Sequence, residues 1–118
     1  MSMFTSVNQL QGYLTLVTDR QQMIATNMAN IDTPGYRTRD VNFQDAMQQV
    51  MNQGDGFDGQ VQPEILEQAG LPERPDGNNV NIDREGLQLS QTQLQFQLGE
   101  QLVKSQFSTL MIAVKDGQ

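Results

Sequence analysis

Apolar residues recur at alternating intervals of four and three along the first 31 residues. This seven-residue repeat is typical of a helix that packs lengthwise against another helix. It predicts an N-terminal helix over residues 1–32, with Gln21 as the only polar member of the seam and Gly12 as a local weak point. The apolar members are Met3, Val7, Leu10, Leu14, Val17, Ile24, Met28 and Ile31.

A second helix of the same kind is predicted over residues 83–116, with Asp83 as a candidate cap. Two neighbouring stripes make its apolar face broad enough to touch more than one other helix. One stripe holds Leu89, Phe96, Val103, Phe107, Leu110 and Val114, and the other holds Leu87, Leu94, Leu98 and Leu102. We therefore predict a mainly α fold in which the two terminal helices form an antiparallel, coiled-coil-like pair.

The segment between these helices, residues 33–82, reads as an irregular, turn-rich centre, and residues 52–80 within it contain three of the four prolines. Residues 43–51 fit a short amphipathic helix, and residues 62–70 could form one more helical turn. Turns, short extended pieces or disorder are expected over the rest of residues 52–80. The whole chain, 1–118, is expected to be one domain.

Composition excludes several classes of function. The net charge is −7, with 7 Lys+Arg, which argues against nucleic acid and anionic lipid as partners. The chain has no Cys and no His, so it lacks thiol chemistry and the commonest general base. Its 19 Gln suit repeated protein contacts, although an ordinary solvated surface explains them equally well. The sequence shows neither a cleavable signal peptide nor a membrane span.

Two acidic, turn-like stretches do not meet the requirements of a metal site. Counting from Asp55, the third and fifth positions are Phe57 and Gly59, which offer no side-chain ligand. The stretch from Asp76 fails at its fifth position, so Asx turns explain both better. Asp83 and Glu85 lack the pocket that paired carboxylates would need. We expect no catalytic residues, no metal, no cofactor and no small-molecule substrate.

The stretch "ANIDTPGY" stops the first helix. Pro34 disfavours helical geometry at Thr33, so the helix should end at or before that residue. Pro-Gly fits a type II turn because Gly35 accepts a positive φ. Asn30 or Asp32 could hydrogen-bond the last helical groups or the turn.

This stretch also carries a resemblance. Residues 28–36, "MANIDTPGY", resemble the Ala-Asn-x-x-Thr-Pro-Gly-Tyr signature of bacterial flagellar axial proteins, the rod, hook and hook-associated proteins. The matching residues, with Asp32 inside the motif, are Ala29, Asn30, Thr33, Pro34, Gly35 and Tyr36. "YRTRDVNFQDAM" and "RPDGNNVNIDRE" are similar to proximal-rod proteins in particular. Asn42 stands where an Asp is more usual, and residues 52–72 have no counterpart.

The resemblance implies a structural subunit of the basal-body rod whose terminal helices pack in the inner tube. It also implies export through the flagellar type III apparatus, without a cleaved signal, to the periplasmic rod. Expected partners are copies of the chain, other rod proteins, the rod-base adaptor, the membrane-ring protein and the export-gate proteins.

The predicted assembly surface combines helix residues with the charged residues after the turn. Its members are Val7, Leu10, Leu14, Val17, Ile24, Met28, Ile31, Arg37, Arg39, Asp40, Leu94, Phe96, Leu98, Val103, Phe107, Leu110 and Val114. Two alternatives remain: a soluble coiled-coil adaptor or flagellar export chaperone, and, with less support, a small acidic enzyme.

Overall fold

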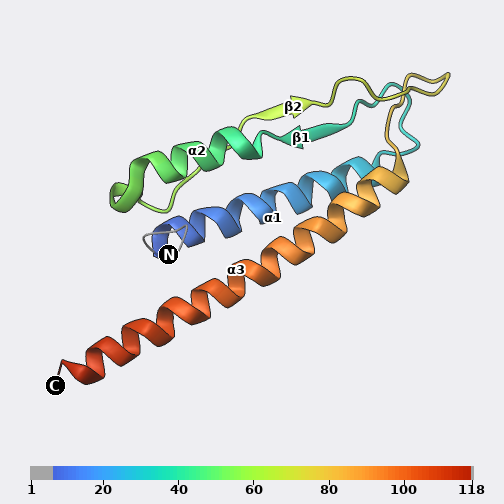
Figure 1. The fold of residues 1–118 in the computed structure, drawn as a ribbon. Coiled ribbons are helices and arrows are strands. Elements are labelled where there is room, and N and C mark those ends of the chain that lie inside the picture. The colour runs from blue at the N-terminus through green and yellow to red at the C-terminus, as the bar shows by residue number, and fades with distance from the viewer. Residues whose placement is uncertain (1–6, 118) are drawn as a thin grey trace.

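Long helices dominate the fold, and the computed structural model describes residues 7–117 except for the side chain of Asp55. The elements in chain order are α1 (Val7–Ala29), β1 (Arg39–Val41), α2 (Phe43–Gln53), the short 3-10 helix η1 (Gly54–Gly56), β2 (Ile65–Glu67) and α3 (Ile82–Asp116). α1 and α3 run antiparallel, while α2 and the two strands lie on the other side of α1 (Figure 1). The predicted mainly α fold with long terminal helices is confirmed.

The ends of the helices differ slightly from the prediction. α1 ends at Ala29 rather than at residue 32, and residues 30–32 form turns. The predicted start of this helix, including Met3, lies outside the described residues. α3 begins at Ile82, and its cap is Asn81 rather than Asp83: the Asn81 side chain accepts hydrogen bonds from the backbone N–H groups of Asp83 and Arg84. Asn is among the best N-cap residues because its side-chain oxygen satisfies these free donors.

A line of small and polar residues on α3 packs against α1. The buried residues of α3 are Glu85, Thr92 and Gly99, which recur every seven residues. A Cβ on Gly99 would lie 2.4 Å from Leu14 Cδ2, so a larger residue there would force the Leu14 side chain to move. The predicted stripe of Leu89, Phe96 and Val103 is only half-buried beside this line.

The hydrophobic core lies on the opposite side of α1. Leu16, Val41, Ala46, Val50 and Phe57 form its buried cluster, and Met23, Phe43, Met47 and Val61 pack around it. Gly12 is a requirement of this core rather than a weak point, because a Cβ there would lie 2.7 Å from the Phe57 ring. α1 therefore has two packed faces, of which the heptad pattern indicated one.

The central segment contains one predicted helix and a pair of short strands that was not predicted. α2 confirms the short amphipathic helix, and the Asn42 side chain caps it by accepting from Asp45 N. Residues 65–67 pair with β1 as an antiparallel strand, with Val41 opposite Ile65, so the helical turn predicted over residues 62–70 is wrong. β2 begins two residues after Pro63, and a proline in or beside a strand is tolerated at the edge of a sheet.

Candidate functional site: the signature turn and the exposed face of α3

The Thr-Pro-Gly-Tyr stretch forms the predicted turn. Tyr36 N donates to Thr33 O at 3.2 Å, and Gly35 has φ +75°, as position i+2 of a type II turn requires. Asn30 binds the end of α1 through Nδ2 to Thr26 O at 2.8 Å, and its Oδ1 accepts from Thr33 Oγ1. Asp32, the other candidate for this contact, is exposed.

The second family motif holds this turn in place from a distant part of the sequence. Asn78 Nδ2 donates to both Asn30 O and Thr33 O at 2.8 Å, and Gly35 N donates to Asp76 O at 2.8 Å. Asp76 Oδ1 also accepts from Asn78 N, which forms the expected Asx turn. The two motifs that carry the resemblance therefore build one structure.

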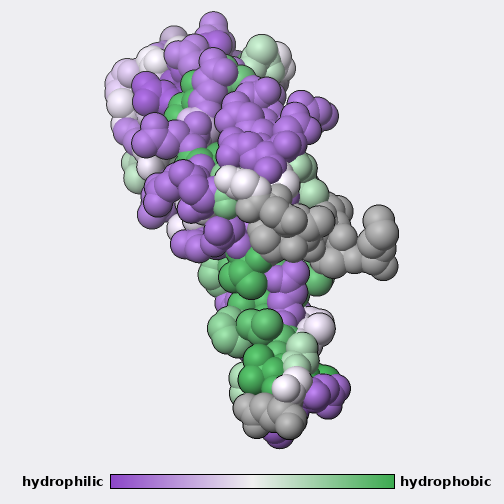
Figure 2. Space-filling model, turned by 90° about the vertical axis from the view of Figure 1, so that its left-hand side faces the viewer, coloured by the Kyte–Doolittle hydropathy of each residue, from purple (hydrophilic) through white to green (hydrophobic). Residues whose placement is uncertain are grey.

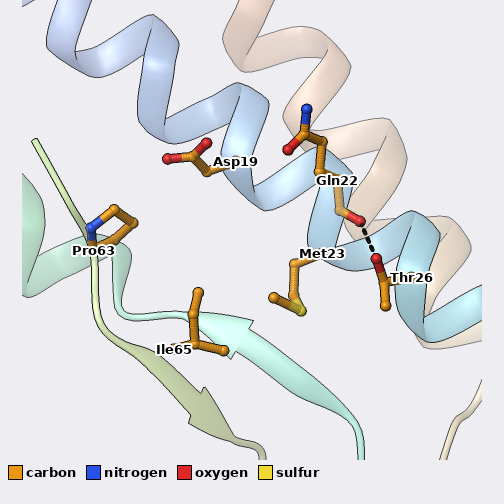
Figure 3. A pocket seen from close by; sticks show the side chains of 6 residues that line it. All are labelled: Asp19, Gln22, Met23, Thr26, Pro63 and Ile65. Carbon is orange, nitrogen blue, oxygen red and sulfur yellow. Dashed lines mark hydrogen bonds between the residues drawn. The ribbon is translucent and has the colours of Figure 1, made fainter.

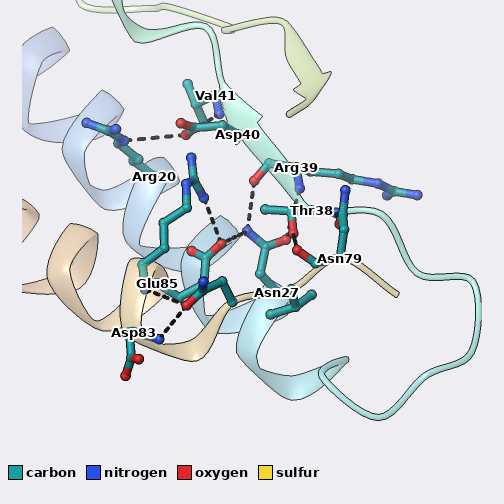
Figure 4. A network of polar contacts seen from close by, with 12 residues as sticks. Arg20, Asn27, Thr38, Arg39, Asp40, Val41, Asn79, Asp83 and Glu85 are labelled. Atoms are coloured by element: carbon teal, nitrogen blue, oxygen red, sulfur yellow. Dashed lines mark hydrogen bonds and ion pairs between the residues drawn. The ribbon is translucent and has the colours of Figure 1, made fainter. Parts of the chain in front are cut away.

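Asn27 is the centre of a buried polar network that joins α1, β1 and α3 (Figure 4). Its carboxamide faces the backbone of Arg39: Nδ2 donates to Arg39 O at 2.8 Å, and Oδ1 accepts from Arg39 N at 3.1 Å. Oδ1 also accepts from Tyr36 Oη at 2.8 Å, and Nδ2 donates to Glu85 Oε1 at 3.2 Å. The Asn27 side chain thus makes the two backbone hydrogen bonds to Arg39 that a neighbouring strand would make on this side of β1.

Glu85 brings a carboxylate into this network. Its side chain is fully buried, and Arg84 Nη1 lies 3.0 Å from Oε1. Burial raises the pKa of Glu85, because desolvation outweighs the opposing effects of Arg84 and of the Asn27 hydrogen bond. Burial likewise raises the pKa of Tyr36, and Arg39 opposes that shift.

We use "polar joint" for the residues that connect the signature turn to the start of α3. They are Asn27, Asn30, Tyr36, Thr38, Asn78, Asn79 and Glu85. Only Asn30 and Tyr36 were predicted as functional residues. The sequence offered one sign that Asn27 matters: it is a polar residue within the apolar pattern of α1.

The three charged residues after the turn are engaged within the chain. Arg37 pairs with Glu73, and Arg20 Nε lies 3.4 Å from Asp40 Oδ1. The Arg39 guanidinium lies over the Tyr36 ring, 5.8 Å from its centroid, and Arg39 is the most exposed of the three. The predicted contact of these residues with a neighbouring molecule therefore stays a prediction.

The apolar members of the predicted assembly surface fall into two groups. Leu10, Val17 and Ile24 are at most 1% exposed, so they already pack inside this chain. Leu14, Met28, Ile31, Phe96 and Val103 are half-buried. The exposed members are Val7, Leu94, Leu98, Phe107, Leu110 and Val114.

Most of the exposed group lies on α3. Its C-terminal half extends past α1, and Met111 and Ile112 add to the apolar surface there at 58% and 60% exposure. Figure 2 shows this end of the molecule as largely hydrophobic and the opposite end as largely hydrophilic. Across residues 7–117, no group of His, Cys, Asp and Glu could hold a metal ion, and no described helix is long and apolar enough to cross a membrane.

Comparison with known proteins identifies the family. No protein-family model matches the chain. The flagellar basal body rod protein FlgB of Salmonella typhimurium is 32% identical over 91% of each chain, and that of Escherichia coli is 31% identical over the same shares. FlgB of Bacillus subtilis is 26% identical over 100% of both chains. The chain therefore belongs to the family of the flagellar basal body rod protein FlgB.

Proposed function

We propose that this chain is a structural subunit of the proximal rod of the flagellar basal body and that it assembles through the exposed apolar face of α3. Family membership supports the first part. One observation carries the second: Phe107, Leu110, Met111, Ile112 and Val114 are each more than half exposed on one stretch of helix. Soluble monomers rarely expose a contiguous apolar surface of this kind, and such surfaces mark sites of protein association.

The rod environment is part of the proposal. The chain would join copies of itself, other rod subunits, the adaptor at the rod base, the membrane-ring protein and the export-gate proteins. It would reach the periplasmic rod by type III export without a cleaved signal. The family resemblance supports these partners and this location.

We also propose that the chain has no enzymatic activity. Its relatives are named as rod proteins. The sequence has neither His nor Cys, so two common sources of general bases and nucleophiles are missing.

The polar joint has a supporting role in this proposal. By fixing the path between α1 and β1 and holding the start of α3, it sets the direction in which α3 leaves the body of the subunit. Ala29, Asp32, Pro34 and Gly35 belong to the turn that this joint holds. Among the charged residues after the turn, Arg39, exposed beside Tyr36, is the one best placed to meet a neighbour.

The test replaces two exposed apolar residues of α3. In cells that lack their own copy of this protein, Phe107→Gln with Leu110→Gln should abolish motility and stop assembly at the rod, as seen by electron microscopy of basal bodies. The free energy of unfolding of the purified variant should change by less than about 0.5 kcal/mol, as for surface positions in general. Gln97→Ala with Gln101→Ala, at exposed polar positions of the same helix, is the control and should leave motility intact. Normal rods in the Phe107→Gln/Leu110→Gln strain would contradict the proposal.

A further inference from the structure

A groove lies between α1 and β2, on the side of the molecule away from α3 (Figure 3). Asp19, Gln22, Met23 and Thr26 line it from one face of α1, and Pro63 and Ile65 line it from the strand side. Met23 and Ile65 approach each other across it and make it apolar. Its volume of about 280 Å³ is below the roughly 300–1,000 Å³ of small-molecule sites, which favours protein side chains as its occupants.

The charged residue that lines this groove is Asp19; Glu67 lies beside it, with Arg39 opposite Glu67 in the strand pair. None of the ion pairs formed within residues 7–117 includes Asp19. Burial raises the pKa of Asp19, which reflects a carboxylate that is partly desolvated. Glu67 lies two residues beyond Ile65 and is exposed, and alternate residues of a strand share a face. An occupant with a cation at each end of an apolar stretch would suit this groove.

The C-terminal half of α3 presents such a face. Lys104, Phe107, Ser108, Met111, Ile112 and Lys115 together line a shallow hollow on the helix. Their spacing places apolar side chains between the two lysines on one side of the helix. Eleven residues of helix separate the lysines by about 16 Å at ~1.5 Å per residue.

These lysines are the cations that the folded chain leaves unused. Three of the five arginines form ion pairs, namely Arg20, Arg37 and Arg84. Arg74 donates to the carbonyls of Ile31 and Val80, and Arg39 stacks on Tyr36. Within the described residues, neither lysine takes part in an ion pair. In a chain of net charge −7, they are the side chains best suited to an acidic groove.

We infer that the Lys104–Lys115 face of α3 in one copy docks into the α1/β2 groove of a second copy. β2 and α3 lie on opposite sides of α1, so one chain cannot make this contact with itself (Figure 1). The two surfaces are different, which makes the contact heterologous, and contacts of this kind continue from copy to copy when the rotation does not close. The inference rests on the proposed function, because it names the surface that receives the exposed α3 face.

The test uses cross-linking in a chain without natural cysteines. Cells that lack their own copy express Ile65→Cys and Met111→Cys chains together, and their basal bodies are oxidised mildly. The expected result is a disulfide-linked dimer that contains one chain of each kind. Gln49→Cys, at an exposed position of α2, replaces Ile65→Cys as the matched control and should give severalfold less dimer. Equal yields from Gln49→Cys and Ile65→Cys would overturn the inference.

Charge reversal gives a second, independent readout. Asp19→Lys in the Ile65→Cys chain should reduce the dimer severalfold, and Lys104→Glu with Lys115→Glu in the Met111→Cys chain should restore it. Failure of this restoration would also overturn the inference. Cross-links between two Met111→Cys chains, without Ile65→Cys cross-links, would reject the groove while keeping assembly through α3. Absence of every cross-link together with normal rods would reject both the groove and the proposed role of α3.

Discussion

The two halves of α3 differ in how much they bury within the chain. The first half buries Glu85, Thr92 and Gly99, a carboxylate, a hydroxyl and a glycine, against α1. The second half buries no residue, and its Phe107 and Leu110 are each 56% exposed, although the first half also exposes Leu94. The buried contact of α3 with α1 thus uses small and polar side chains, and the apolar side chains of the second half stay exposed.

This division has a physical reason. In the first half, Glu85 accepts a hydrogen bond from Asn27 of α1, and Gln95 O accepts one from Tyr13, so these directional contacts favour one register between α1 and α3. Apolar surface has no such directional requirement and can meet several neighbours. A subunit that assembles with other rod components benefits from having both kinds of surface.

The largest effect should come from removing the centre of the polar joint. Asn27→Ala leaves the Arg39 backbone groups and the Tyr36 hydroxyl without their partner. Each buried polar group left unsatisfied costs ~1–3 kcal/mol, so the free energy of unfolding should fall by about 3 kcal/mol or more. Urea denaturation followed by circular dichroism measures this. Gln22→Ala, exposed on the same helix, is the control; equal losses in the two variants would show that the joint does not hold the helices.

A smaller loss should follow from filling the helix contact. Gly99→Val places a side chain against Leu14 and Tyr13, and overpacking of this kind costs ~1–3 kcal/mol. Gly86→Val is the matched control, because nothing lies within 4 Å of a Cβ at Gly86, and its unfolding free energy should not fall. Met111→Gln, in the exposed half of α3, should change stability by less than about 0.5 kcal/mol. If Gly99→Val and Gly86→Val unfold at the same urea concentration, the close approach at Gly99 is unimportant.

The smallest effect concerns pH. The pKa of Glu85 is raised from its ordinary value of 4.5 by burial, so the folded chain binds a proton more readily than the unfolded chain. The contribution of this group to stability is therefore present below pH 4.5 and is lost as the pH rises through the folded-state pKa. Glu85→Gln should weaken this dependence in urea titrations at several pH values. Asp19→Asn removes the second carboxyl with a raised pKa, which allows the two contributions to be separated. An unchanged slope in Glu85→Gln would contradict the assignment.

Local patterns predicted much of the fold. The seven-residue repeats predicted α1 and α3, the amphipathic pattern of residues 43–51 predicted α2, and Pro34-Gly35 predicted the type II turn. In each case a few neighbouring residues carry the determining physics: periodic burial in the helices and a positive φ in the turn.

Long-range partners could not be predicted in the same way. β2 is only three residues long and pairs with β1 across the whole of α2, so its own sequence carries little strand signal. Asn27, Asn78 and Asn79 are buried because their amides bind backbone groups from other parts of the chain. From sequence alone, an asparagine indicates a turn or a helix cap. Its hydrogen bonds to distant backbone groups become visible only in the tertiary structure. For the same reason, the apolar stripes of α3 did not indicate which face contacts α1.

Hydrogen exchange of the purified, unassembled chain tests the contrast between the halves of α3 most directly. Backbone amides between residues 86 and 99, which pack along α1, should exchange slowly, and those between residues 104 and 114 should exchange quickly. In isolated basal bodies, the second group should become protected as well. Equal protection of both halves in the unassembled chain would contradict the account, because the second half would then be stable without neighbours.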